Sequence, residues 1–411
     1  LALSYPSNMY KLFFDVTQTS NVMIKQPLLK AFLTIFSMAL LATSLQAKPM
    51  KVFILAGQSN MEGHAAVRTF PHIGMDPKTA PLLERMVDKK GEPIVLDDVY
   101  ISFLTGAKDQ NEKLYEGQLT AGFGSKGREP KVGPEFTFGI YLAKHLKEPF
   151  LIIKTAWGGK SLHTDFLSPS GAKESEGKES GLFYNLMIKH VNHVLQDPKA
   201  VHPAYDPKAG YEISGFVWFQ GWNDMVDGSH YPKRYEKGGY DLYSTLMAHF
   251  IRDVRKDLNA PKMNFIIGVM GAGGPTDAYK SPRYKGVHQY FRDAMAAPSK
   301  LPEFQNNVKA VLTENYWDAQ LAELDERMNA KVKNALRKAQ KEGALKGLKG
   351  KELRKANDAM AEKLKKQHFT EEELKALTTG KSNAGFHYLG SSKVLCQIGR
   401  AFADAMAEFQ K

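Results

Sequence analysis

Cysteine is almost absent from this chain, and its scarcity excludes two kinds of cysteine chemistry. The 411 residues include one cysteine, Cys396. A single thiol excludes both an intrachain disulfide framework and a metal site built from cysteines. Cys396 lies at apolar spacing within a predicted helix over 393–409, which indicates a small buried core residue rather than a nucleophile.

Long hydrophobic runs are also scarce. The run over 31–42 is short for a bilayer span, follows a positively charged stretch that begins at Met23, and precedes a small-residue cleavage site ending at Ala47. That order is typical of a secretory signal peptide. We therefore expect 23–47 to be a signal peptide and 1–22 an over-extended gene start. The mature protein is then exported to the periplasm or the extracellular space, without stable membrane insertion. A buried helix or a membrane anchor is the alternative.

Positive charge is in excess, but its pattern is not typical of a surface that binds nucleic acid. The formal net charge is +12, which by itself favours nucleic acid or an acidic polymer as partner. Over 321–380, fifteen Lys/Arg stand among ten Asp/Glu, as on a solvated helix face. No aromatic residues alternate with these charges, so base stacking is not indicated. We expect no nucleic-acid partner, and a weak attraction to acidic polysaccharide stays open.

Short apolar runs alternate with longer amphipathic ones from Lys51 onward. This alternation indicates a mostly parallel sheet covered by helices on both faces. We expect one domain over 48–411, a three-layer α/β/α sandwich. Strands are predicted at 52–56, 150–154, 215–219, 264–270 and 308–312, and helices at 134–146, 181–195, 242–258, 285–297 and 393–409.

The segment over about 318–379 breaks this pattern. It is rich in Ala, Lys, Glu and Leu, contains no proline, and has the spacing of a capping box at Thr370 and Glu373. We predict a charged helical insertion that packs as a hairpin. A coiled-coil partner site is the alternative, although a sustained heptad repeat is missing.

A serine follows the first predicted strand, in Gly57-Gln58-Ser59-Asn60-Met61. Ligands of open α/β sheets bind at the carboxyl ends of strands. A serine becomes a nucleophile only with a base to take its proton and donors to stabilise the oxyanion. The base and the donors should therefore follow other strands.

Three further segments have suitable residues. Residues 155–161 follow the second predicted strand, and their paired glycines free a backbone N–H to point into a site. Residues 215–224 run from a buried strand into a polar turn. Residues 385–391 contain His387 and immediately precede the C-terminal helix.

The four segments, which span nearly all of 51–409, resemble the signature blocks of SGNH-type esterases. The first resembles the GQSNM block of the carbohydrate O-acetylesterases of the sialate O-acetylesterase group. The resemblance implies a flavodoxin-like SGNH-hydrolase fold and a serine esterase without cofactor. It implies Ser59 as nucleophile, His387 as general base, and oxyanion donors from Gly158 or Gly159 and from Gln220 or Asn223.

One residue of the family pattern is missing. An aspartate usually lies three residues before the histidine and orients its ring, but here that position is Ala384, preceded by Asn383. Asp224, another acid brought in by folding, or a backbone carbonyl could replace it, and we favour the carbonyl. Trp222 stands where many relatives carry glutamate, and could stack on a sugar ring. Further candidates for substrate contact are Gln58, Asn60, His64 and His163.

Competing templates do not fit. Met61 replaces the second glycine of the G-x-S-x-G elbow, and the segment ending at Ser161 lacks the first glycine of a phosphate loop. The histidines His64, His163, His230 and His387 show no metal-ligand spacing, so we predict no metal.

The expected function is hydrolysis of O-acetyl esters on a sugar or polysaccharide through an acetyl-serine. A catalytically impaired carbohydrate-binding relative and an esterase acting on other acyl esters are the alternatives. Trp157, Trp218 and Trp222 mildly favour sugars.

Overall fold

The computed structural model describes residues 48–106, 112–175 and 179–410. The predicted gene start and signal peptide fall on 1–47, outside the described residues. No helix of the described part has the length and apolar character needed to cross a membrane.

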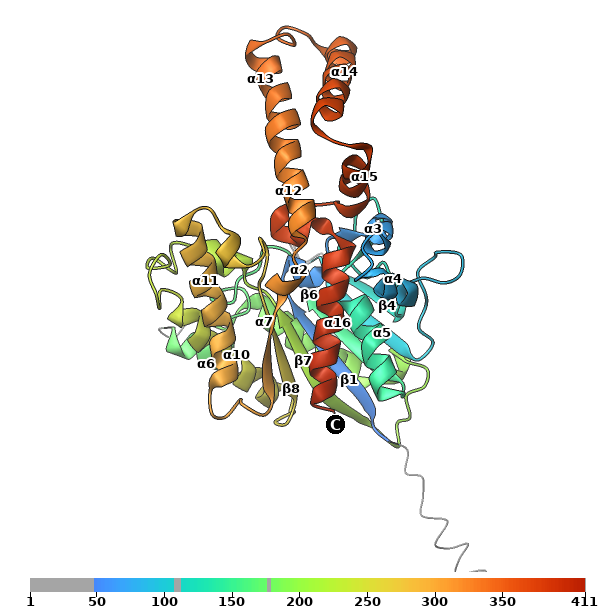
Figure 1. Cartoon of the computed structure of the whole chain (residues 1–411). Coiled ribbons are helices and arrows are strands. Elements are labelled where there is room, and N and C mark those ends of the chain that lie inside the picture. Colours follow the sequence, from blue (N-terminus) through green and yellow to red (C-terminus); the bar gives the residue numbers. More distant parts are fainter. Residues whose placement is uncertain (1–47, 107–111, 176–178, 411) are drawn as a thin grey trace, which may run out of the picture. The chain divides into compact units, whose positions relative to one another are not determined.

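A seven-stranded sheet forms the centre of the unit over 49–411 (Figure 1). All neighbouring strands are parallel except the edge strand β4, which is antiparallel to β3. The strand order is β4 (Lys113–Gln118), β3 (Val99–Thr105), β6 (Phe150–Ala156), β1 (Met50–Gly57), β7 (Tyr211–Phe219), β8 (Asn264–Val269) and β9 (Val308–Leu312). A separate antiparallel pair joins β2 (Ala65–Ala66) to β5 (Lys131–Val132).

Alternate residues of β1 belong to different hydrophobic clusters, which shows that the sheet is covered on both faces. Val52 and Ile54 pack with helices α7, α10 and α11, whereas Phe53 and Leu55 pack with α5 and α16. A strand buried on both sides requires the continuous apolar run seen in the sequence. The helices are α5 (Glu135–Leu146), α7 (Leu182–Gln196), α10 (Asp241–Asp257), α11 (Pro282–Ala296) and α16 (Ser392–Glu408). The predicted α/β sandwich is confirmed.

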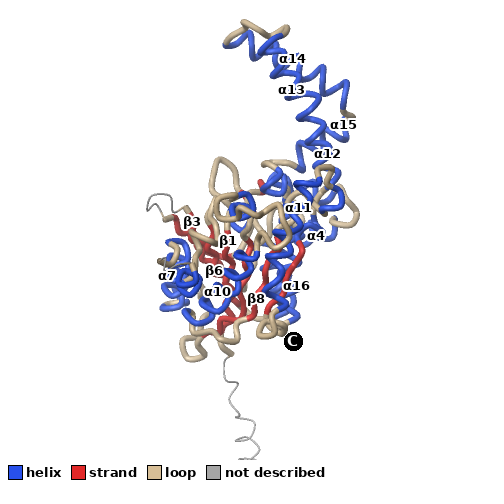
Figure 2. Tube along the Cα trace, turned by 90° about the vertical axis from the view of Figure 1, so that its left-hand side faces the viewer, coloured by secondary structure: helices blue, strands red, loops and turns tan. Residues whose placement is uncertain are grey.

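Four helices occupy the segment that interrupts the strand–helix alternation. They are α12 (Ala319–Met328), α13 (Asn334–Glu342), α14 (Gly350–His368) and α15 (Glu371–Gly380), with a π-helical turn η5 (Asn329–Lys333) between the first two. A small cluster of their own buries Leu324, Val332 and Phe369. Thr370 and Glu373 form the predicted capping box. In Figure 2 these helices lead away from the sheet, so the segment adds little to the main core.

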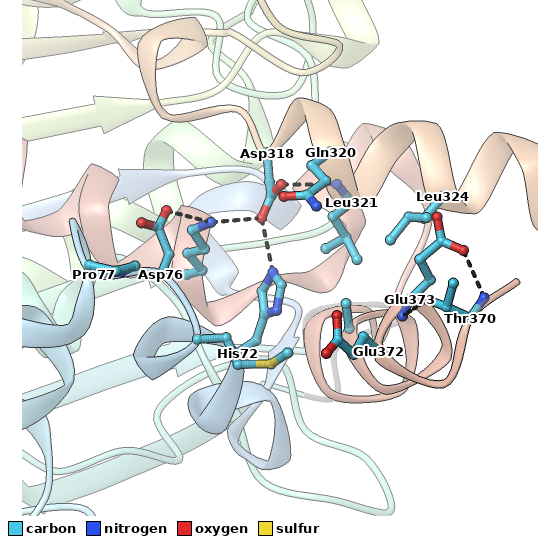
Figure 3. Close-up of a pocket in the computed structure, with 13 residues that line it drawn as sticks. His72, Asp76, Pro77, Asp318, Gln320, Leu321, Leu324, Thr370, Glu372 and Glu373 are labelled. Atoms are coloured by element: carbon cyan, nitrogen blue, oxygen red, sulfur yellow. Dashed lines mark hydrogen bonds and ion pairs between the residues drawn. The ribbon is translucent and has the colours of Figure 1, made fainter.

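Ion pairs fasten the base of these helices to the sheet domain (Figure 3). Asp318 accepts from His72 Nε2 at 2.9 Å and pairs with Lys393 Nζ at 3.2 Å, and Lys393 also pairs with Asp76 at 3.0 Å. Burial acts to raise the pKa of Asp318, but the His72 hydrogen bond, the Leu321 N–H and Lys393 outweigh it and lower the pKa to about 2. The carboxylate therefore stays ionised. A cavity of about 430 Å³ lies here, and none of its lining residues belongs to the four signature segments.

Candidate active site

Three of the four signature segments follow the central strands β6, β1 and β7. They therefore lie together at the carboxyl ends of these strands. Gly57, the last residue of β1, pairs with Ala156 of β6 and with Phe219 of β7. Beyond the strands, the Trp157 N–H donates to Gly57 O at 3.2 Å and the Gln58 N–H to Phe219 O at 3.3 Å. The parallel register thus continues past the strand ends and brings these segments together, as expected for a ligand site of an open sheet.

Ser59 is the first residue of the short helix α2 (Ser59–Glu62) and is 6% exposed. A Cβ on Gly57 would lie 2.1 Å from the Phe219 carbonyl oxygen, so only glycine allows β1 to approach β7 before this turn. A Cβ on Gly158 would lie 3.9 Å from the Ser59 Cβ. Within the described residues, the N–H groups of Ser59 and Gly158 have no hydrogen-bond acceptor. Two backbone donors are therefore free beside the serine.

His387 lies in the 3₁₀ turn η6 (Gly385–Gly390), which packs against α2. The Asn60 Nδ2 donates to the Phe386 carbonyl at 3.2 Å, which joins the residue after Ser59 to the residue before His387. The ring of His64 stacks on that of His387, with centroids 4.1 Å apart and planes 6° from parallel. The fold therefore brings the predicted nucleophile and base to the same place, although no direct hydrogen bond joins them within the described residues. Such bonds often tighten only when substrate binds.

The turn around His387 is held in a costly backbone conformation. Tyr388 and Leu389 have φ angles of 51° and 62°, in the left-handed region that residues with a side chain seldom adopt. The buried Tyr388 hydroxyl accepts from the Gly271 N–H at 2.7 Å and bonds Thr313 Oγ1 at 2.6 Å. These buried bonds, which come from the ends of β8 and β9, fix the turn and offset its strain.

Asn383 orients the His387 ring. Its Oδ1 lies 3.1 Å from His387 Nδ1 and also accepts the Ala384 N–H at 2.7 Å. A backbone N–H can only donate, so the atom it reaches must be the amide oxygen rather than the amide nitrogen. The ring must then donate from Nδ1, and the lone pair on Nε2 remains available as a base. The orienting group is thus a side-chain amide one position before the residue where the family carries aspartate.

Asp224 does not orient His387, which corrects one candidate from the sequence. Its buried carboxylate accepts from the Leu162 N–H at 2.8 Å, from Gln220 Nε2 at 2.6 Å and from the Tyr231 hydroxyl at 2.9 Å. Burial raises its pKa despite these donors. Asp224 therefore ties together the segments after β6 and β7. The favoured main-chain carbonyl is also absent, because the acceptor is the Asn383 side chain.

Of the two candidate side-chain oxyanion donors, Gln220 and Asn223, the hydrogen bonds favour Asn223. Gln220 Nε2 is committed to Asp224, to the Lys160 carbonyl at 2.9 Å and to Gln58 Oε1 at 3.2 Å. Within the described residues, Asn223 Nδ2 donates only to the Gly159 carbonyl, at 3.1 Å, and keeps a second proton. Asn223 is therefore the available side-chain donor. Gln220 and Gln58 are buried braces, because Gln58 Oε1 also accepts the Gly221 N–H at 3.1 Å.

Burial keeps the His387 imidazole neutral. Desolvation, together with the adjacent His64 and with Lys131, lowers the pKa of His387 to about 4, while Glu62 acts in the opposite direction. Glu62 Oε2 lies 3.5 Å from His64 Nε2. Burial acts to raise the pKa of Glu62, but His64, Lys154 and Thr105 outweigh it and lower the pKa. A largely buried carboxylate, with 13% of its side chain exposed, thus lies beside His64. Glu62 is not among the residues predicted from sequence, although it is two positions from His64.

Aromatic rings lie beside the histidine. Trp222 and Phe386 have ring centroids 5.7 Å apart, and Phe386 contacts the His387 ring at 4.4 Å. Phe386 is 42% exposed, so part of this surface is open to a ligand. His163, also predicted from sequence, is buried and lies against Asp227 and His230 instead.

Comparisons with known proteins identify the family of the chain. A family profile described as "Carbohydrate esterase, sialic acid-specific acetylesterase" matches residues 49–315, more than half of the chain. An Arabidopsis thaliana protein of known X-ray structure is 21% identical, with 64% of this chain and 86% of that chain covered and a TM-score of 0.38. A carbohydrate acetylesterase from Xanthomonas citri is 14% identical, with 72% and 57% covered and a TM-score of 0.38. No curated protein matches. By its family profile, the chain belongs to the sialic acid-specific acetylesterase family of carbohydrate esterases and is a carboxylic ester hydrolase.

Proposed function

We propose that this esterase removes O-acetyl groups from a sugar or polysaccharide through an acetyl-enzyme on Ser59. The observation that carries the proposal is the position of His387. Its neighbour Phe386 is bonded to Asn60, its ring stacks on His64, and its Nδ1 is tied to Asn383. Within the described residues, these contacts hold a neutral imidazole, with no hydrogen bond on Nε2, in the turn that packs against the helix of Ser59.

The proposed reaction has two halves. Ser59 Oγ attacks the acetyl carbonyl carbon while His387 Nε2 takes the hydroxyl proton. The oxyanion accepts hydrogen bonds from the Ser59 and Gly158 N–H groups and from Asn223 Nδ2. The intermediate then expels the sugar oxygen, which takes the proton from Nε2 and leaves acetyl-serine. Water then attacks the acetyl carbon while His387 Nε2 takes a proton from it. The second tetrahedral intermediate expels Ser59 Oγ, which takes that proton back from Nε2, and the acetyl group leaves as acetic acid, which ionises to acetate.

Positive charge on His387 during the reaction is stabilised differently from that in a Ser-His-Asp triad. The amide oxygen of Asn383 holds the tautomer but has no net charge. The carboxylate of Glu62 lies 3.5 Å from His64 Nε2 and acts to raise the pKa of His387. This departure keeps the impaired carbohydrate-binding relative as a second candidate, because an orienting acid commonly contributes orders of magnitude in rate.

Acetate release separates the two candidates. Purified protein should release acetate from acetylated monosaccharides and from acetylated polysaccharide, and should hydrolyse 4-nitrophenyl acetate faster than the octanoate ester. Acetate can be measured by an enzyme-coupled assay. Release no faster than with the Ser59→Ala variant would support the impaired relative. A preference for octanoate would contradict the substrate class while retaining an esterase.

The pH dependence should reflect the buried imidazole. Only neutral His387 acts as base, so activity is present above its folded-state pKa and is lost as pH falls through it. We expect the acid limb of kcat/KM near pH 4 rather than near the ordinary histidine value of 6.5. Asn383→Asp should move that limb upward by about one pH unit or more, since a carboxylate beside Nδ1 favours the imidazolium.

The control for this shift is Asn306→Asp, which makes the same charge change on an exposed residue. Its acid limb should stay in place. An acid limb near pH 6.5 in the unmodified protein, or one that Asn383→Asp leaves unmoved, would show that His387 is not the titrating base.

A further inference from the structure

Two histidines and an aspartate converge next to the candidate active site. His163 follows β6, whereas Asp227 and His230 follow helix α9 (Trp222–Val226). One ligand atom from each lies within 4.8 Å of the other two, and no other group of three such residues occurs in the described part of the chain. Sequence spacing gave no sign of this cluster, because long-range folding joins His163 to the other two.

Both imidazoles face the same carboxylate oxygen. Asp227 Oδ2 lies 3.2 Å from His163 Nε2 and 2.9 Å from His230 Nδ1. The rings stack with centroids 3.7 Å apart and planes 22° from parallel. Ligand atoms about 2.0–2.1 Å from a Zn²⁺ ion in tetrahedral geometry are roughly 3.3 Å from one another. The two nitrogen–oxygen distances are already close to that value.

Neighbouring groups fix the direction of the donor atoms. His163 Nδ1 bonds Thr164 Oγ1 at 2.7 Å, which leaves Nε2 toward Asp227. Asp227 Oδ1 accepts the N–H groups of Ser229 at 2.8 Å and His230 at 3.2 Å, which leaves Oδ2 toward the rings. Metal-binding histidines and carboxylates are commonly held by such outer hydrogen bonds.

We propose that His163, Asp227 and His230 bind a divalent transition-metal ion, with Zn²⁺ as the best match. Imidazole and carboxylate donors suit Zn²⁺, and three protein ligands leave a position for water. The ion joins the segment that contains Gly158 to the turn after α9, the helix that contains Asn223. It therefore clamps the two segments that carry the proposed oxyanion donors, although binding of the ion itself does not depend on the proposed esterase mechanism.

A simple ion pair is the competing explanation. In that case one imidazole at a time donates to Asp227, and the cluster has no need of a metal. The two explanations differ in stoichiometric metal binding, which an ion pair does not give. They also differ in thermal stability, which Zn²⁺ raises only if it binds the folded state.

The test uses untagged, chelator-treated protein and titrates Zn²⁺ against a chromophoric chelator. Metal retained after gel filtration is counted by mass spectrometry, and melting is followed by circular dichroism. We expect one equivalent of Zn²⁺ and a higher Tm with the metal. His230→Gln and Asp227→Asn should each weaken binding by roughly tenfold or more.

His230 has a side chain 38% exposed, so His230→Gln should fold normally. The matched control is His145→Gln, at an exposed histidine that pairs with Asp404 at 3.3 Å but has no third ligand among the described residues. It should bind Zn²⁺ like the unmodified protein. Absence of stoichiometric binding, or binding and Tm shift unchanged in His230→Gln and Asp227→Asn, would overturn the proposal.

Discussion

Ser59→Ala will lower kcat for acetyl-ester hydrolysis by about four to six orders of magnitude. The change removes the atom that attacks the ester, while the free N–H groups of Ser59 and Gly158 remain. Ser59 Oγ makes no hydrogen bond within the described residues, so its loss should leave Tm nearly unchanged. Initial rates with 4-nitrophenyl acetate and melting by circular dichroism measure the two effects.

The matched control for this variant is Ser168→Ala. Ser168 is also buried, at 2% exposure, and its Oγ has no hydrogen-bond partner within the described residues. Ser168 lies outside the four signature segments, so the Ser168→Ala protein should keep full activity. A Ser59→Ala protein with a tenth or more of the normal rate would contradict a serine nucleophile and leave the family assignment intact.

His387→Ala should lower kcat by about three to five orders of magnitude, since the serine then has no base in either half of the reaction. Added imidazole should restore part of the rate, because the deletion leaves room for a ring against His64. Combining the change with Ser59→Ala should cost little beyond either single change, since the two groups act as one unit.

His64→Ala is the control that separates chemistry from packing. It removes the same ring stack, 4.1 Å between centroids, but keeps the base and its bond to Asn383. A much smaller loss than that of His387→Ala is expected, without imidazole rescue. Equal losses in both variants would indicate that the stack, rather than proton transfer, accounts for the effect.

The sheet and its helices follow closely from local patterns. The five predicted strands lie within or nearly match β1, β6, β7, β8 and β9, and the five predicted helices agree with α5, α7, α10, α11 and α16 to within a few residues. Continuous apolar runs and amphipathic periods are local properties, so they can be recognised without knowing what packs against them. The strand β3, Val-Tyr-Ile-Ser-Phe-Leu-Thr, has a similar local signal but is not among the predicted strands. The mostly exposed β4 had none, because only its pairing with β3 makes it a strand.

The candidate site likewise has residues that the sequence indicates and contacts that only the tertiary structure reveals. The sequence alone determined the family resemblance and the candidates Ser59, Gly158, Asn223 and His387, because each lies in a short segment that follows a strand or precedes a helix. Hydrogen-bond partners depend on how loops fold and meet, which no local period encodes. Tertiary structure therefore decided that Asn383 holds His387, that Asp224 and Gln220 brace the loops, and that His163 reaches Asp227 and His230.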